Sequence, residues 1–310
     1  MNFSRFLIGR FIAGLIVLWA AATLTFLMMH LTGGDTAIAI LGGPDAMPTA
    51  TQIARVRAEY GLDQPLIVQY GDFLQKLAQG DLGESYRLRI PVADAIAEQL
   101  WPTITLAFSA AVTAVVLAVL IAVTTARRGK LVREVASTGE LLVIAMPTFV
   151  IGLALLMAFA VYLPIFPVAN APGWRGLVLP TLSLALPVAA MLAQVLRQEL
   201  EDVLEQPFIL TARSRGLSDM ATRLQHALRH AATPVITLSG FVLATLLGGA
   251  AVTEALFARP GIGRLMVEAT SATDVPVVVG VTLFGALVYV IANLIVDVVG
   301  ALIDPRTAAA

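Results

Sequence analysis

The chain has 310 residues, of which 58% are hydrophobic and 13% carry a charge. Soluble chains carry about 25% charged residues, and here the apolar residues come in long uncharged runs, which excludes an ordinary soluble domain. The net charge of −1 gives no electrostatic basis for nucleic-acid binding, and the absence of cysteine excludes disulfides, thiolate metal sites and cysteine nucleophiles.

Six runs are long and apolar enough to cross a bilayer. A helix rises 1.5 Å per residue, so about 20 residues span the hydrocarbon, and one charge at its centre costs roughly 2.5–3.5 kcal/mol. We therefore expect an all-α polytopic membrane protein with six transmembrane helices and charge-free spans. The expected spans are 11–31, 103–126, 141–163, 177–196, 231–253 and 275–296. The first run stays apolar through Met29, which is too long for a signal peptide, so we expect it to be retained.

The distribution of Lys and Arg predicts that both termini are cytoplasmic. Twelve of these residues fall on the side of the termini and eight on the other side. Five of the eight lie in one loop of about 70 residues, and long loops count little in the positive-inside rule. The cytoplasmic segments are then 1–10, 127–140, 197–230 and 297–310. In a bacterial inner membrane, the periplasmic segments are 32–102, 164–176 and 254–274.

The long loop 32–102 has the signals of two short helices. Thr49 and Gln52 form a capping-box pattern, and Gly61 is suited to end the helix that they start. A second, amphipathic helix is expected from Pro65 to Gly80. Such a helix pair either lies on the membrane surface or provides a docking platform for an extracytoplasmic partner, and periodicity alone does not separate the two.

A basic segment between the fourth and fifth runs, residues 206–234, is punctuated like two short helices. We call it the elbow. Pro207 suits the first turn of a helix and Gly216 suits the left-handed position after its end. Ser218 is placed to cap a second helix, with Asp219 favourable in its first turn.

The first helix of the elbow carries an apolar patch outside the lipid. Phe208, Ile209 and Leu210 are expected to be exposed there, beside Arg213 and Arg215. An exposed apolar patch favours a protein partner. The alternative is a helix that lies in the headgroups with its arginines on phosphates.

Several motifs follow one another in a distinctive order. They are Met29–Asp35 (MHLTGGD), Gly61–Leu66 (GLDQPL), Gln69-Tyr70, Gly80–Tyr86 (GDLGESY), Leu179-Pro180, Leu186-Pro187, Thr211–Leu217 (TARSRGL), His226–Arg229 (HALR), Glu254–Leu265 (EALFARPGIGRL) and Asp304–Arg306 (DPR). With these motifs the chain resembles the permease subunits of bacterial binding-protein-dependent ABC importers, in the B-type form of the peptide and nickel branch. The elbow resembles their EAA loop, although Leu210 and Thr211 stand where the generic motif has Glu and Ala.

The resemblance implies the type I importer permease fold, with the short helix of the elbow as a coupling helix in a groove of a cytoplasmic ATPase. The residues it implies for this contact are Pro207, Phe208, Ile209, Leu210, Thr211, Ala212, Arg213, Arg215 and Gly216. The chain itself would be non-catalytic and bind no cofactor, with ATP and Mg on two partner ATPases. The other implied partners are a C-type permease in a pseudo-twofold heterodimer, a solute-binding protein and membrane lipid. The implied solutes are di- and oligopeptides, with nickel, a metallophore or glutathione as alternatives.

Small and weakly polar residues gather in the fifth run, with one isolated glutamine in the fourth. They either pack against neighbouring helices or line the translocation path. These candidates are Gln194, Thr237, Ser239, Gly240, Thr245 and Gly248. Family analogy also suggests that Pro260, Gly261 and Gly263 contact the binding protein.

Two other classes of protein are disfavoured by the sequence. An ion-coupled carrier needs ionisable groups within its spans, and the six runs contain no Asp, Glu, Lys or Arg. A membrane enzyme needs clustered acids, bases or metal ligands, and the chain has no G-x-x-x-x-G-K-S/T, H-E-x-x-H or G-x-S-x-G motif. His226 and His230 have the spacing of a ligand pair, but the nearby arginines would repel a cation, so no metal site is expected.

Overall fold

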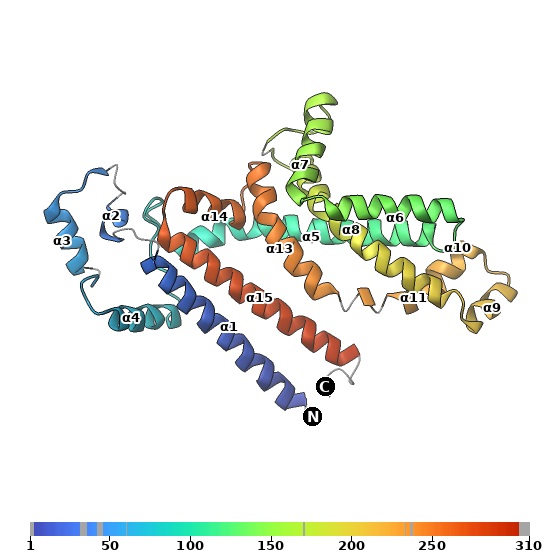
Figure 1. Ribbon diagram of the computed structural model, residues 1–310, viewed down its shortest axis with the longest axis horizontal. Coiled ribbons are helices and arrows are strands. Elements are labelled where there is room, and N and C mark those ends of the chain that lie inside the picture. Colours follow the sequence, from blue (N-terminus) through green and yellow to red (C-terminus); the bar gives the residue numbers. More distant parts are fainter. Residues whose placement is uncertain are drawn as a thin grey trace. The chain divides into compact units, whose positions relative to one another are not determined.

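The computed structural model describes residues 3–31, 36–41, 46–59, 61–169, 171–232, 234–235 and 238–303. The chain divides into two compact units, one of Met1–Trp101 with Gly261–Ala310 and the other of Pro102–Pro260. Within the described ranges the regular structure is helical (Figure 1), and strand-like pairing is limited to one isolated bridge between Glu84 and Pro91.

Four described helices are long and apolar enough to span a bilayer. They lie at Ile8–Leu31 in α1, Val92–Thr125 (α5), Arg175–Val203 (α8) and Val275–Ile295 in α15. A fifth candidate is a broken pair, in which α6 (Lys130–Ala145) and the helical segment Thr148–Tyr162 meet at 103°. The described apolar stretch Thr245–Leu256 of α13 (Ser239–Leu256) is shorter than a span.

In the first unit, α1 (Phe3–Leu31) runs side by side with α15 (Val275–Ile303), as Figure 1 shows. A Cβ atom on Gly14 would lie 2.7 Å from Cγ1 of Val290, so the glycine permits a close approach of the two helices. The short helix α14 (Ile262–Ser271) packs on the start of α15. Val92 and Ile96, at the beginning of α5, are buried in the same cluster as Val277.

The predicted helices of the long loop are α3 (Ala50–Glu59) and α4 (Leu66–Ala78), preceded by the short α2 (Thr36–Ile40). The capping box is confirmed, because the backbone N–H of Thr49 donates to Oε1 of Gln52 at 2.8 Å. Gly61 and Gly80 have φ of +65° and +79° and follow the two helices, as predicted.

The apolar face of α4 packs on protein in the first unit. Phe73 and Leu77 join a cluster with Ala22 of α1 and Val279 of α15. The loop that follows α4 is held by the buried carboxylate of Asp274, which accepts hydrogen bonds from the Ser85 hydroxyl at 2.5 Å and from two backbone N–H groups. These contacts fix the loop to the beginning of α15.

In the second unit, α5 and α8 meet along a row of small residues. Alanines four apart on each helix are buried in one cluster. They are Ala110, Ala114 and Ala118 of α5 and Ala185, Ala189 and Ala193 of α8. Small side chains let helix backbones approach closely in a bilayer. Sequence analysis placed the small-residue packing face in the fifth run and missed this row.

The third expected span, 141–163, is not one continuous helix. The helix breaks between α6 and α7 (Thr148–Leu156), and α7 continues as the π-helical segment η2 (Met157–Tyr162). The cause is Pro147, because a residue before proline is pushed out of the helical region. Met146 accordingly has extended dihedral angles, φ −83° and ψ 130°.

The helix at the fourth expected span is continuous despite two internal prolines. The helix α8 runs for 29 residues through Pro180 and Pro187, and it has the largest buried share of the four long helices described. Proline is tolerated inside membrane helices when neighbouring helices satisfy the freed backbone groups. The dense packing of α8 therefore makes it the core of the second unit.

Candidate functional site

The elbow folds into the two short helical segments that the sequence predicts. The first is α9 (Pro207–Ser214), with proline at its first position and Gly216 at φ +83° after its end. The second begins at the N-cap Ser218, whose hydroxyl accepts from the N–H of Ala221 at 3.2 Å. It runs through α10 (Asp219–Thr222), the π-helical turn η3 (Arg223–Ala227) and α11 (Leu228–Ala231).

The two faces of α9 differ from the expectation at one residue. Ile209 is only 1% exposed, so the prediction of an exposed Ile209 is wrong. It shares a buried cluster with Leu200 of α8 and Val123 of α5, and Ala212, three residues along the same face, is also buried. Leu210 is 72% exposed, and Phe208 is 36% exposed. The apolar patch is therefore split between an inner anchor and an outer surface.

The two arginines of α9 differ in their surroundings. Nη2 of Arg213 donates to Oδ1 of Asp219 at 3.1 Å, so this arginine belongs to an exposed ion pair within the elbow. Arg215 lies exposed at the end of the helix. The ring of Phe208 lies 5.1 Å from that of His230. Together these contacts join α9 to the second part of the elbow.

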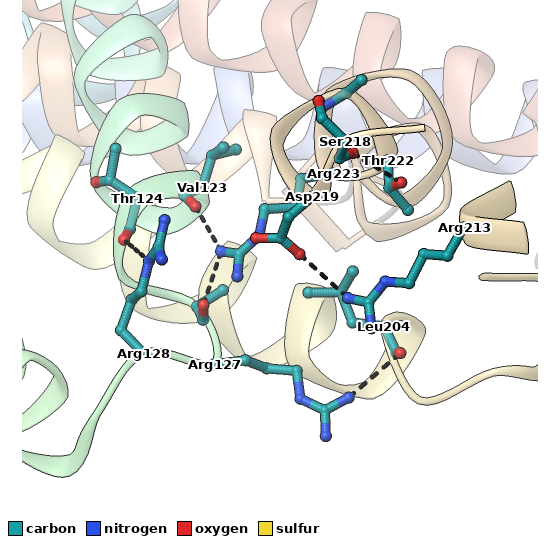
Figure 2. A network of polar contacts seen from close by, with 12 residues as sticks. Val123, Thr124, Arg127, Arg128, Leu204, Arg213, Ser218, Asp219, Thr222 and Arg223 are labelled. Atoms are coloured by element: carbon teal, nitrogen blue, oxygen red, sulfur yellow. Dashed lines mark hydrogen bonds and ion pairs between the residues drawn. The ribbon is translucent and has the colours of Figure 1, made fainter. Parts of the chain in front are cut away.

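A buried arginine lies at the centre of the polar network that Figure 2 shows. The side chain of Arg223 is 3% exposed. Its Nη1 donates to the carbonyls of Val123 and Ala126, each at 2.7 Å, and its Nε donates to Oδ2 of Asp219 at 2.9 Å. A buried charge is tolerated only when it is paired and hydrogen-bonded, and these three contacts meet that condition.

Sequence analysis missed the role of Arg223 and counted it only as a cytoplasmic positive charge. The signal was present in part, because Asp219 and Arg223 have the i,i+4 spacing of a helical ion pair. Val123 and Ala126 lie about a hundred residues earlier in the chain, and no local pattern points to them.

The turn after α5 also contacts the end of α8. Arg127 adopts a left-handed conformation with φ +49°, and its backbone N–H donates to the Glu201 carboxylate at 3.2 Å. Its side chain donates to the carbonyl of Leu204 at 3.3 Å (Figure 2). The end of α8, just before the elbow, and the turn between α5 and α6 are thus neighbours within the second unit.

A polar cleft of about 400 Å³ lies between α6 and α8. Gln194 lines it, beside Arg197, whose guanidinium forms two 2.6 Å hydrogen bonds with the carboxylate of Glu140. Both side chains of this pair are less than a tenth exposed. The pair was not predicted from the sequence. Glu140 directly precedes the third run and Arg197 directly follows the fourth, so both were assigned to cytoplasmic segments.

The residues expected to line the path are only partly described. Thr245 and Gly248 are exposed on one side of α13, whereas a Cβ on the neighbouring Gly249 would lie 2.8 Å from Leu184. The remaining candidates lie outside the described part of the chain, Thr237 entirely and Ser239 and Gly240 in all but the backbone of α13, as do the motif residues 32–35 and 304–306.

The last turn of α13 contains another buried carboxylate. Glu254 is fully buried and accepts a hydrogen bond from the Thr103 hydroxyl at 2.7 Å. The pKa of the nearby Arg259 is lowered because the guanidinium is buried, and the opposing effect of the Glu254 charge is smaller. Pro260 ends the second unit, and Gly261 is the extended residue before α14, in which Gly263 lies.

Comparison with known proteins covers nearly the whole chain. Residues 114–309 match the family described as "Binding-protein-dependent transport system inner membrane component", and residues 3–107 match the N-terminal model of such membrane components. The chain is 38% identical over 312 residues to a putative peptide transport system permease protein of Brucella abortus (strain 2308), covering 98% of each chain. It is 36% identical over 302 residues to the glutathione transport system permease protein GsiC of Salmonella choleraesuis, covering 97% of this chain and 98% of the relative. The chain therefore belongs to the binding-protein-dependent transport system inner membrane component family, as an ABC importer permease subunit of the peptide and nickel branch.

Proposed function

We propose that this permease subunit pairs with a second, similar permease and forms with it a pathway for di- and oligopeptides across the bacterial inner membrane. Two cytoplasmic ATPases supply the energy, and α9 is the coupling helix on which one of them docks. A solute-binding protein delivers the peptide from the other side. The chain binds no cofactor in this scheme, and ATP and Mg act on the ATPases.

The geometry of α9 is the observation that carries this proposal. Ile209 anchors the helix on the second unit, while Leu210 and Arg215 remain exposed on its outer surface. Pro207 and Gly216 limit it to a short, stiff segment. An exposed leucine on a helix that ends in a positive charge suits a groove with apolar walls and an acidic rim. Arg213 is already paired with Asp219, so Arg215 is the better candidate for contact with the ATPase.

The mechanism follows from a two-state equilibrium of the spans. A ligand shifts such an equilibrium only by its differential affinity for the two states. ATP favours the closed ATPase dimer, and closure would carry the attached coupling helices toward each other. Because α9 is anchored through Ile209, that displacement would reach α5 and α8 and convert an inward-open pathway to an outward-open one.

Contacts between distant segments support the proposed topology. The turn at Arg127 contacts Leu204 at the end of α8, and both are predicted to be cytoplasmic. The loop at Ser85 contacts Asp274, and both are predicted to be periplasmic. Each contact joins two segments assigned to the same side of the membrane, so the pairing of the segments fits this topology, while the distribution of Lys and Arg gives its orientation.

The same arrangement suggests where solute passes. We assign the exposed side of α13, at Thr245 and Gly248, to the wall of the path or to the partner permease, and Gln194 to the polar cleft at its cytoplasmic end. The turn at Pro260, Gly261 and Gly263 is the assigned contact for the binding protein. A weakly polar wall would accept varied side chains, as peptide transport requires.

The solute class rests on the names of relatives. One is a peptide permease and another a glutathione permease. Glutathione is itself a short peptide with amide, ammonium and carboxylate groups, so the two names agree on a small zwitterionic solute. Nickel or a metallophore is the alternative within the same branch.

The test is uptake by proteoliposomes that contain this chain, its partner permease, the ATPases and the binding protein. Labelled dipeptide or tripeptide should accumulate only when ATP is present on the side of the membrane that carries the ATPases. A proton uncoupler should not stop this uptake directly. Labelled glutathione and nickel, each with the same complex, distinguish the alternatives. Uptake by the chain alone, without ATPases, would refute the proposal.

A further inference from the structure

We propose that Arg223 is a positioning residue that connects the coupling helix to the C-terminal end of α5, so that displacement of α9 is transmitted to this span at a fixed angle. This inference rests on the proposed docking of an ATPase on α9. It assigns a function to a buried side chain that does not touch the ATPase surface.

Arg223 caps the C-terminal end of α5. The last carbonyls of a helix have no partner within the helix. In a continuing helix the carbonyl of Val123 would accept the N–H of Arg127, but that N–H donates instead to Glu201. Nη1 of Arg223 takes its place, with 2.7 Å contacts to the carbonyls of both Val123 and Ala126. The guanidinium is thus a C-terminal cap for α5, supplied from another part of the chain.

Asp219 connects Arg223 to α9. The carboxylate of Asp219 accepts from Nε of Arg223 through one oxygen and from Nη2 of Arg213 through the other. Arg213 lies in the last turn of α9. Figure 2 shows the resulting chain of contacts, which runs from α9 through Asp219 and Arg223 to the end of α5.

The hydrogen bonds of Arg223 give the connection between α9 and α5 a fixed direction. The buried cluster around Ile209 also joins α9 to α5 and α8, but apolar contacts are non-directional. A planar guanidinium with three charge-assisted hydrogen bonds fixes both distance and orientation. Arg223 also begins the π-helical turn η3, and such turns often occur at functional sites.

Arg223→Lys tests the inference, because the compact ammonium keeps the charge but cannot reproduce the planar fork that holds the carboxylate and two carbonyls together. In proteoliposomes with the complete importer, we expect the amount of solute moved per ATP hydrolysed to fall by about twofold to thirtyfold, the range for coupling networks. The ATPases should still copurify with the complex. Arg229→Lys is the matched control, since Arg229 is exposed on α11 and should leave the ratio unchanged.

Asp219→Asn is the second variant. It leaves Arg223 on the α5 carbonyls and weakens the contacts of residue 219 with both Arg223 and Arg213, so it serves if Arg223→Lys does not fold. We expect a smaller fall in the same ratio. An unchanged ratio in every folded variant would overturn the inference, and so would loss of the ATPases from Arg223→Lys, because Arg223 would then maintain the docking surface. If the ATPases do not bind α9 even in the parent chain, the proposed function itself fails.

A distance measurement gives a readout without transport. The chain has no cysteine, so spin labels can be placed at Ser214→Cys of α9 and Leu120→Cys of α5, both exposed positions. We expect the same distance distribution in the nucleotide-free and ATP-bound complexes of the parent chain, and a broader one with Arg223→Lys. A nucleotide-dependent change in the parent distance would show that α9 moves independently of α5 and would overturn the inference.

Discussion

Removing the Glu140 carboxylate should destabilise the protein more than removing any exposed acid. Glu140 and Arg197 join α6 to α8 through two 2.6 Å hydrogen bonds, and their side chains are 4% and 8% exposed. Glu140→Ala leaves the guanidinium buried without its partner, which typically costs about 3–5 kcal/mol. For a chain of this size the midpoint of thermal unfolding should fall on the order of 10 °C.

Two further variants separate charge burial from simple loss of a side chain. The double variant Glu140→Met with Arg197→Met replaces the pair by apolar side chains, and it should recover most of the lost stability. Glu134→Ala is the control, because Glu134 pairs with Lys130 at 3.8 Å on the exposed surface. An exposed pair contributes less than about 1 kcal/mol.

The assay is thermal unfolding in detergent, followed by the fluorescence of the three tryptophans. The expected order of stability is parent and Glu134→Ala together, then the double variant, then Glu140→Ala. The reasoning is refuted if Glu140→Ala unfolds at the temperature of the parent. It is also refuted if the double variant is no more stable than the single one.

Three other predictions address the elbow and the loop contact. Gly216→Val places a β-branched residue at φ +83° and should abolish uptake without preventing membrane insertion. Gly216→Asn should retain uptake, because asparagine tolerates this conformation. Normal uptake by the valine variant would contradict the role of Gly216 in ending α9. Leu210→Asp should release the ATPases on copurification without lowering thermal stability, while Ile209→Ala should cost about 2–5 kcal/mol of stability; equal behaviour of the two would contradict the split of the patch. Asp274→Asn should make the loop at Ser85 more sensitive to limited proteolysis, because the charged acceptor of three hydrogen bonds is lost; an unchanged cleavage rate would contradict its anchoring role.

The short-range features of the chain could be predicted from sequence. Pro207, Gly216 and Ser218 mark the helix boundaries of the elbow, and Thr49 with Gln52 marks the start of α3. These predictions succeed because a cap or a left-handed residue depends on a few neighbouring residues. The ordered motifs also carried the family assignment, which the full-length similarity to known permeases confirms.

Some failures of prediction were local as well. Pro147 was visible within the third run, and its effect on Met146 explains the break between α6 and α7. The alanines four apart in α5, beginning at Ala110, have a spacing that could have marked a close helix contact. In both cases the long apolar run was the stronger signal and concealed the finer pattern.

The amino-acid sequence by itself determined the class of the protein, its apolar runs and the ends of its short helices, since hydropathy and backbone conformation are set by adjacent residues. Only the tertiary structure decided which face of α9 is buried at Ile209 and which groups meet the charges of Arg223 and Arg197. The physical reason is that a buried charge or an apolar anchor is defined by its partners. Some of those partners lie far away in the chain, since Glu140 is 57 residues from Arg197 and Val123 is 100 residues from Arg223.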